Sequence, residues 1–142
     1  MNTTQKGEYI VKLAFQISLI FYSGSLLLDC YCTSNSDCQS SFLALLTGWM
    51  GLPLGWVFLS WLANPFLWFA WFKRKSIKTS LILSVIATIF AFLFLFHSTI
   101  IVNEAGSQGR ITDYKMGYWF WLLSSVLMLF GTAFRLLESK MK

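Results

Sequence analysis

Three cysteines and a single histidine are the side chains of this sequence with the clearest capacity for chemistry. Cys30, Cys32 and Cys38 lie within one stretch of nine residues, and His97 follows much later. Thiolate and imidazole ligands together suit Cu(I) or Zn²⁺, so a metal- or redox-active protein is one hypothesis. The spacing matches no structural zinc pattern, and we therefore favour a disulfide without a bound metal.

The pairing of the cysteines is limited by their spacing. Cys30 and Cys32 are too close in sequence to bridge one another easily, so Cys38 is expected to pair with one of them. Such a bond requires an oxidising compartment. One thiol is left over, and it is either free or used in an intermolecular bridge.

Two side-chain amides interrupt the apolar runs of the sequence. Asn64 directly precedes Pro65, which has no N–H to bond the carbonyl of Trp61. We favour a hydrogen bond from Asn64 to a neighbouring helix, and the alternative is a polar ligand or ion path in a channel or small transporter. Gln16 is expected to hydrogen-bond between helices in the same way.

Sequence motifs for enzymatic chemistry are absent. The sequence contains no HExxH, GxSxG or Walker motif and no paired acidic residues within its apolar runs. Pumps, proton-coupled transporters and intramembrane proteases need ionisable groups at depth in the membrane. We therefore predict a protein that is not an enzyme and has no cofactor.

Four long apolar runs must position these residues. Apolar residues make up 56% of the chain and charged residues 12%, against about 25% in soluble domains. The runs cover about 9–28, 42–72, 79–101 and 116–137, and each is long enough to cross a bilayer as a helix. The sequence thus predicts an all-α integral membrane protein, with a bundle of four transmembrane helices forming one domain over residues 1–142. The first run is interpreted as a retained helix, with a cleaved signal peptide as the alternative.

The second run is longer than one crossing requires. Residues 42–72 contain both prolines, five of the seven tryptophans and no charged side chain. Pro53 lies in a glycine-rich stretch, so we predict a long second helix with a break near 51–53 and a kink at Pro65. The part before the break is expected to be tilted or interfacial, and the part after it to be the crossing.

Small side chains recur on the predicted helices at spacings that let two helices approach closely. Those assigned to helix packing are Gly48, Gly51, Gly55, Ser84, Thr88 and Gly131. They exceed the needs of one small bundle, and we therefore predict a homo-oligomer or a subunit of a larger membrane complex. Four tryptophans near the ends of the runs are typical of aromatic belts at the membrane surface, namely Trp68, Trp71, Trp119 and Trp121.

The basic residues predict the orientation in the membrane. With four crossings, one side holds both termini, the central loop and nine lysines and arginines, whereas the other holds only Arg110 and Lys115. This bias places the termini in the cytoplasm and the loops 29–41 and 102–115 in the periplasm or outside the cell. It also explains the net charge of +5 without nucleic-acid binding. Four basic residues of the central loop region are expected to contact lipid headgroups, namely Lys73, Arg74, Lys75 and Lys78.

The sequence favours a function in recognition rather than catalysis. We expect a non-enzymatic protein of a bacterial inner membrane that acts as a sensor or effector in phage or envelope defence, or as an immunity protein. Its expected partners are the lipid bilayer, further copies of the chain and a protein bound at the outer loops. A channel or small transporter subunit with a polar path near Asn64 is the first alternative, and the metal- or redox-active protein is the second.

Overall fold

The computed structural model describes residues 3–34, 36–102 and 106–141 of the 142-residue chain. The described part is mostly helical, and three of its helices are long and apolar enough to cross a membrane. These are α1 (Thr3–Leu26), α4 (Ile77–Leu93, continued by the 3₁₀ turn η3, Phe94–Phe96) and α5 (Met116–Lys140). They correspond to three of the four apolar runs of the sequence.

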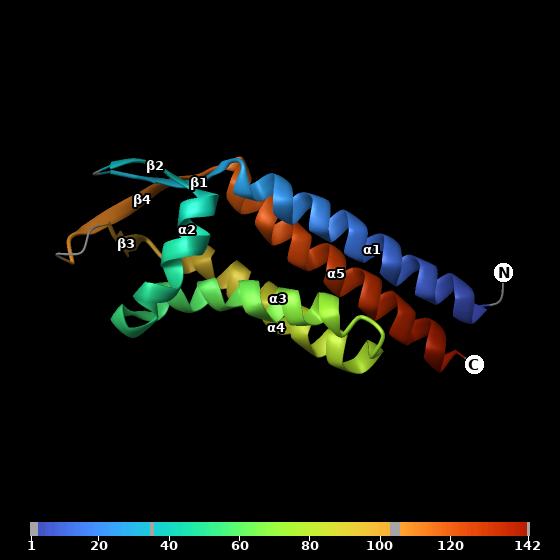
Figure 1. Cartoon of the computed structure of the whole chain (residues 1–142). Helices are drawn as coiled ribbons and strands as arrows, with labels where there is room; N and C mark the ends of the chain where they lie inside the picture. The colour runs from blue at the N-terminus through green and yellow to red at the C-terminus, as the bar shows by residue number, and fades with distance from the viewer. Residues whose placement is uncertain (1–2, 35, 103–105, 142) are drawn as a thin grey trace.

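The second apolar run is not one long helix. It begins with α2 (Ser41–Thr47), continues as the 3₁₀ segments η1 (Gly48–Leu54) and η2 (Trp56–Leu62), and ends with α3 (Ala63–Phe72). The break predicted near 51–53 therefore extends over both 3₁₀ segments. Figure 1 shows α2 standing across the ends of the long helices, whereas α3 runs beside α4.

Of the two prolines, Pro65 differs from its prediction and Pro53 agrees with its own. Pro65 does not kink a helix, because it lies in the first turn of α3. A proline is tolerated there, since the first N–H groups of a helix have no intrahelical partner. The change from 3₁₀ to α geometry comes just before it, at Leu62 and Ala63. Pro53 lies within η1 and belongs to the predicted break.

A small antiparallel sheet occupies the two connections that the sequence analysis left as loops, so the protein is not all-α. Residues 97–101 were predicted as the end of a helix. Instead η3 ends at Phe96, His97 is extended, and Thr99–Ile101 form a strand of this sheet. Pairing of the two connections satisfies their backbone N–H and C=O groups within the protein. The strands are β1 (Asp29–Thr33), β2 (Ser36–Ser40), β3 (Thr99–Ile101) and β4 (Gln108–Tyr114), in the order β2-β1-β4-β3.

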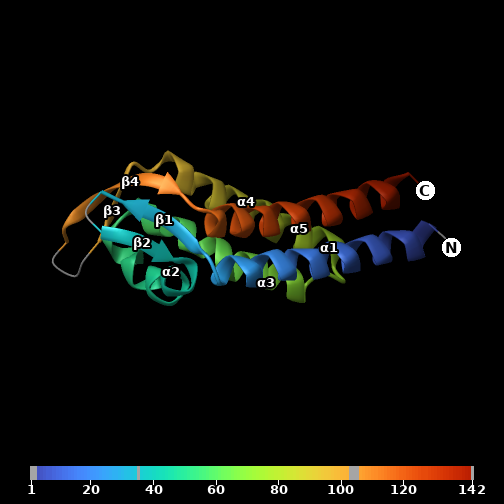
Figure 2. The same cartoon turned by 90° about the horizontal axis from the view of Figure 1, so that it is seen from above.

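The long elements form two antiparallel pairs. α1 lies beside α5, and α3 lies beside α4, in both views of the molecule (Figures 1 and 2). α4 also packs against α5, which joins the two pairs. Both termini and the turn between α3 and α4 lie at one end of the bundle, and the sheet and α2 lie at the other.

Small side chains bring the helices close together within one chain. Gly131 of α5 faces α1 so closely that a methyl group added at this position would clash with Ala14. Ser84 of α4 hydrogen-bonds with Thr132 of α5 (3.3 Å), and both residues are buried. These contacts use the packing residues inside the bundle. Because these small residues pack within one chain, they are no longer an argument for a homo-oligomer. The homo-oligomer stays a prediction.

Several polar and aromatic residues lie on a different side of their helix from the one predicted. Trp71, expected in an aromatic belt, is only 8% exposed and donates its indole N–H to Ser18 Oγ (3.0 Å). Gln16, expected to bond between helices, is exposed on the outside of α1. The lipid-facing and protein-facing sides of a membrane helix are both apolar, so the sequence pattern does not distinguish them.

Candidate functional site

Asn64 is the centre of a hydrogen-bond network that joins α1, α3 and α5. Its side chain is 4% exposed. Oδ1 accepts hydrogen bonds from the Tyr22 hydroxyl (3.0 Å) and the Trp121 indole N–H (2.9 Å). Nδ2 donates to the carbonyl of Trp61 (2.9 Å), which Pro65 leaves without its usual helical partner. Asn64 therefore makes the interhelical hydrogen bonds that the favoured interpretation required.

Toward the end of the bundle that holds the termini, the surroundings of the network are largely apolar. On that side Tyr22 belongs to a buried apolar cluster with Leu67, Trp71 and Met128. A water-filled route would need polar side chains or exposed backbone at this depth. Polar groups do occur on that side, because Trp71 donates its indole N–H to Ser18 Oγ and Ser18 donates to the carbonyl of Ser124. The channel alternative therefore stays a prediction.

A cavity of about 230 Å³ lies on the sheet side of Asn64. Asn64 and Trp121 bound it toward the bundle, Ala44 and Leu45 of α2 form one wall, and Ile100 of β3 lies on the sheet side. A cavity of about 150 Å³ in another protein holds one benzene molecule. The cavity therefore has room for a substituted ring or a group of similar size.

Two buried serine hydroxyls lie at the cavity, and that of Ser60 has no hydrogen-bond partner in the protein, whereas that of Ser41 lies beside the Cys30 thiol. Ser41 begins α2 and is 7% exposed, and Ser60 lies in η2 and is 3% exposed. A buried hydroxyl left without a partner costs about 1–3 kcal/mol. Such groups are rare in native proteins and call for an explanation, and a bound molecule that supplies the missing bond is one.

The cavity lining is neutral. None of the described side chains that form it carries a formal charge. Cys30 also lines it, and burial raises the pKa of this thiol to about 12, an effect that the neighbouring Ser41 hydroxyl only partly offsets. Cys30 is therefore a protonated thiol at physiological pH and a poor nucleophile. The site offers hydroxyl and thiol groups among aromatic and aliphatic side chains.

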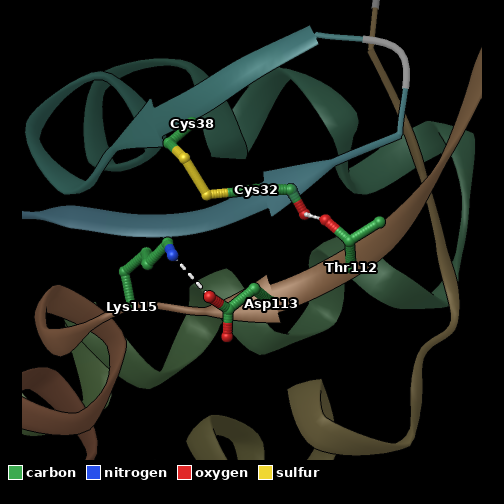
Figure 3. The surroundings of a disulfide bond; sticks show 5 residues. All are labelled: Cys32, Cys38, Thr112, Asp113 and Lys115. Carbon is green, nitrogen blue, oxygen red and sulfur yellow. Dashed lines mark hydrogen bonds and ion pairs between the residues drawn. A yellow bond between two sulfur atoms is a disulfide. The ribbon is translucent and has the colours of Figure 1, made fainter.

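A disulfide between Cys32 and Cys38 ties β1 to β2 beside the cavity (Figure 3). It is one of the two pairings that the spacing left open, and Cys30 is the free thiol. On its other side, β1 is joined to β4, where Thr112 Oγ1 donates to the carbonyl of Cys32 (3.2 Å). The central strand is thus fixed to both of its neighbours.

The ligands of the alternative metal site are not assembled. The disulfide uses two of the three thiols, and Cys30 faces the neutral cavity. His97 lies beyond η3 in extended backbone. In the described ranges no group of three or more His, Cys, Asp or Glu side chains is close enough to hold a metal ion. The hypothesis of a metal centre therefore has no support in this arrangement.

The glycines of the second run have unequal roles. Gly48 lies against the indole ring of Trp61, where a larger residue would clash. The same indole donates its N–H to the carbonyl of Leu45 (2.8 Å). Trp61 therefore holds α2 and η1 against η2, and so closes the cavity wall. Gly55, in contrast, has open space where a side chain would be.

Most basic residues lie at the end of the molecule opposite the cavity, and Arg110 and Lys115 lie at the sheet end. The three lysines predicted to contact headgroups are exposed at the first of these ends, namely Lys73, Lys75 and Lys78. Two arginines there have internal partners instead. Arg74 lies over the ring of Phe15, 4.4 Å from its centroid, and Arg135 pairs with Glu8 (3.3 Å). Contact of Lys73, Arg74, Lys75 and Lys78 with lipid headgroups stays a prediction.

Sequence reasoning missed the cavity and its two serines. Ser60 occurs in an apolar run, where serine is a common packing residue between membrane helices, and Ser41 was placed at the end of a polar loop. The available signal was the concentration of glycine and proline in residues 48–65. Irregular backbone at membrane depth occurs where it is buried in protein or lines a cavity, so this segment was the place to expect one.

No protein-family model matches the chain, and neither a curated protein nor a solved structure is similar to it. The function proposed for the protein is therefore based on its own residues and their arrangement.

Proposed function

We propose that the protein crosses a bacterial inner membrane four times, with both termini in the cytoplasm, and acts by recognition at its outer end rather than by catalysis. The observation that carries this proposal is the disulfide-fixed sheet beside a cavity with an unpaired hydroxyl group. These features lie at the end of the bundle opposite most of the basic residues, where a molecule outside the cytoplasm would meet the protein.

The fourth crossing in this proposal consists of η2 and α3. A rise of about 2.0 Å per residue over Trp56–Leu62 and about 1.5 Å over Ala63–Phe72 gives about 29 Å. This length is close to the roughly 30 Å of hydrocarbon in a bilayer. α2 lies across the bundle and does not contribute to the crossing. Its exposed apolar side chains, among them Phe42 and Leu46, suit the boundary between headgroups and acyl chains.

The orientation follows from the positions of the charges. The end that holds the termini also holds the exposed lysines of the α3–α4 turn. A basic end of this kind remains in the cytoplasm. The sheet then lies outside it, in the compartment where a disulfide persists.

Recognition at the outer end suits the roles expected from the sequence, which are a sensor or effector in phage or envelope defence, or an immunity protein. Each needs a stable outer surface and no reaction centre. A homo-oligomer and a protein partner at the sheet stay part of this proposal. The particle mass in lipid nanodiscs distinguishes a single chain from an oligomer.

The experiment that tests the recognition role compares a deletion strain with strains that carry the gene on a plasmid. We expect the deletion to change sensitivity to phage, to a pore-forming bacteriocin or to envelope stress. Cys32→Ser combined with Cys38→Ser releases β2 from β1 and should fail to restore the phenotype. Cys30→Ser is the matched control, because it keeps the disulfide and should restore the phenotype. Unchanged sensitivity of the deletion strain to all three challenges would contradict the proposal.

A further inference from the structure

We propose that the cavity binds one neutral, lipid-soluble molecule that accepts hydrogen bonds through carbonyl oxygens, the chemistry shared by quinone rings and glyceride esters. This inference rests on the recognition role at the outer end and names the ligand class for it. It follows from the unpaired Ser60 hydroxyl, the absence of charge, the size of the cavity and the apolar helix α2 beside it.

The unpaired Ser60 hydroxyl determines the hydrogen-bonding character of the ligand. The indole N–H groups of Trp61 and Trp121 line the cavity but are already bonded to the Leu45 carbonyl and to Asn64. The Ser60 hydroxyl is buried and has no partner. A carbonyl oxygen in the cavity would accept a hydrogen bond from the Ser60 hydroxyl and so remove the cost of burying that hydroxyl.

The neutral lining determines the charge of the ligand. A phosphate, carboxylate or ammonium group buried here would face no opposite charge, and an unpaired buried ion is very unfavourable. Cys30 cannot supply a charge, because burial keeps its thiol protonated. The ligand, or the part of it that enters the cavity, is therefore uncharged.

The walls determine its shape and its source. Phe94 and Trp121 offer aromatic faces on which a planar ring stacks. The volume of about 230 Å³ suits one substituted ring or an ester group with a short acyl segment. Ala44, Leu45 and Thr47 of α2 line the cavity, and the other face of this helix exposes Leu43 and Leu46. A ligand dissolved in the bilayer would therefore reach the cavity beside this apolar helix.

Three substitutions in the full-length protein test the proposal. Ala44→Phe fills the cavity from α2, and Leu43→Phe is its matched control on the exposed face of the same helix. Ser60→Ala removes the unpaired hydroxyl and leaves the volume nearly unchanged. The probes are decylubiquinone and dioleoylglycerol, each titrated against protein in detergent micelles and counted by native mass spectrometry.

We expect saturable binding of one probe molecule per chain, lost in Ala44→Phe and unchanged in Leu43→Phe. Ser60→Ala should weaken binding about three- to tenfold, as expected for one neutral hydrogen bond. Without ligand, Ser60→Ala should unfold at the same temperature as the wild type or a higher one, which a purely structural serine would not allow. Retention of decylubiquinone alone assigns a quinone, and retention of dioleoylglycerol alone assigns a glyceride ester.

Two results would overturn the ligand assignment. One is the failure of both probes to bind the wild-type protein. The other is binding that Ala44→Phe and Ser60→Ala leave unchanged. Neither result would overturn the recognition role, which is tested separately by the phenotype of the Cys32→Ser, Cys38→Ser variant.

Discussion

Replacement of Asn64 by leucine tests whether one amide holds three helices together. Asn64→Leu keeps a side chain of similar size but removes the Oδ1 acceptor and the Nδ2 donor at the centre of the network. The Tyr22 hydroxyl and the Trp121 indole N–H lose their acceptor, and the Trp61 carbonyl loses its donor. These groups are enclosed by the protein and cannot form hydrogen bonds with bulk water unless the packing changes.

The expected cost follows from the number of bonds. An interhelical hydrogen bond in a membrane protein is worth about 0.6 kcal/mol on average, so the two bonds to Tyr22 and Trp121 contribute about 1 kcal/mol. Buried groups left without partners add to this figure, because each costs about 1–3 kcal/mol when no water reaches it. We expect Asn64→Leu to lower the free energy of unfolding by about 2–4 kcal/mol.

The measurement is an unfolding titration with sodium dodecyl sulfate in mixed micelles, followed by tryptophan fluorescence. Gln16→Leu is the matched control, since it replaces another amide in an apolar run by the same residue. Gln16 is exposed on α1, so its replacement should change the free energy of unfolding by less than about 0.5 kcal/mol. Equal effects of the two substitutions would refute the assignment of Asn64 as the centre of the network.

Three further predictions concern packing, the free thiol and the disulfide. Gly131→Ala should destabilise the protein by about 1–3 kcal/mol in the same titration, because its methyl group overlaps α1. Gly24→Ala should be tolerated, because its added methyl group meets only ordinary contacts, and an equal loss in both variants would contradict this packing. Cys30 has a folded-state pKa of about 12 against an ordinary value of 9.0, so its contribution to stability should be complete below pH 9 and fall as the pH rises toward 12. The difference in unfolding free energy between the wild type and Cys30→Ser should follow that window, and a difference independent of pH would contradict it. Cys32→Ser with Cys38→Ser should lower stability by about 2 kcal/mol and speed amide hydrogen exchange in β1 and β2, and unchanged exchange would show that the sheet does not depend on the bond.

The three helices that are long and apolar enough to cross a membrane follow from the sequence because lipid would impose a simple rule on it. Apolar runs without charge must be helical in a bilayer, and α1, α4 and α5 obey that rule. The charges at the ends of the runs follow from the same physics. The disulfide was limited to two pairings by the spacing of Cys38 from the other cysteines.

The sheet was not predictable from local pattern. Its strands are short and partly polar, and β1 pairs with β4, which is far away in sequence, as Cys32 opposite Asp113 illustrates. Nothing within either connection indicates the other as its partner. Short strands gain their stability from such pairing rather than from propensity, so a reading of local sequence interprets them as loops.

The candidate site was predictable only in part. Asn64 and Pro65 indicated a polar contact at an irregular segment, and the structure adds Tyr22 and Trp121 from other helices. The unpaired Ser60, in contrast, carries no sequence signal. A serine in a helix usually donates to its own backbone, as Ser125 does to the carbonyl of Leu122 (2.8 Å). Only the three-dimensional arrangement shows which serines do not.

The central claim is four crossings with the sheet outside the cytoplasm, and cysteine labelling of intact cells tests it most directly. Single cysteines replace Ser76 in the α3–α4 turn, Ser107 before β4 and Ser139 near the end of α5, each in a Cys30→Ser background. We predict that a membrane-impermeant maleimide labels Ser107→Cys in intact cells, and labels Ser76→Cys and Ser139→Cys only after lysis. Labelling of Ser76→Cys in intact cells would show that η2 and α3 do not cross the membrane, and would contradict the account.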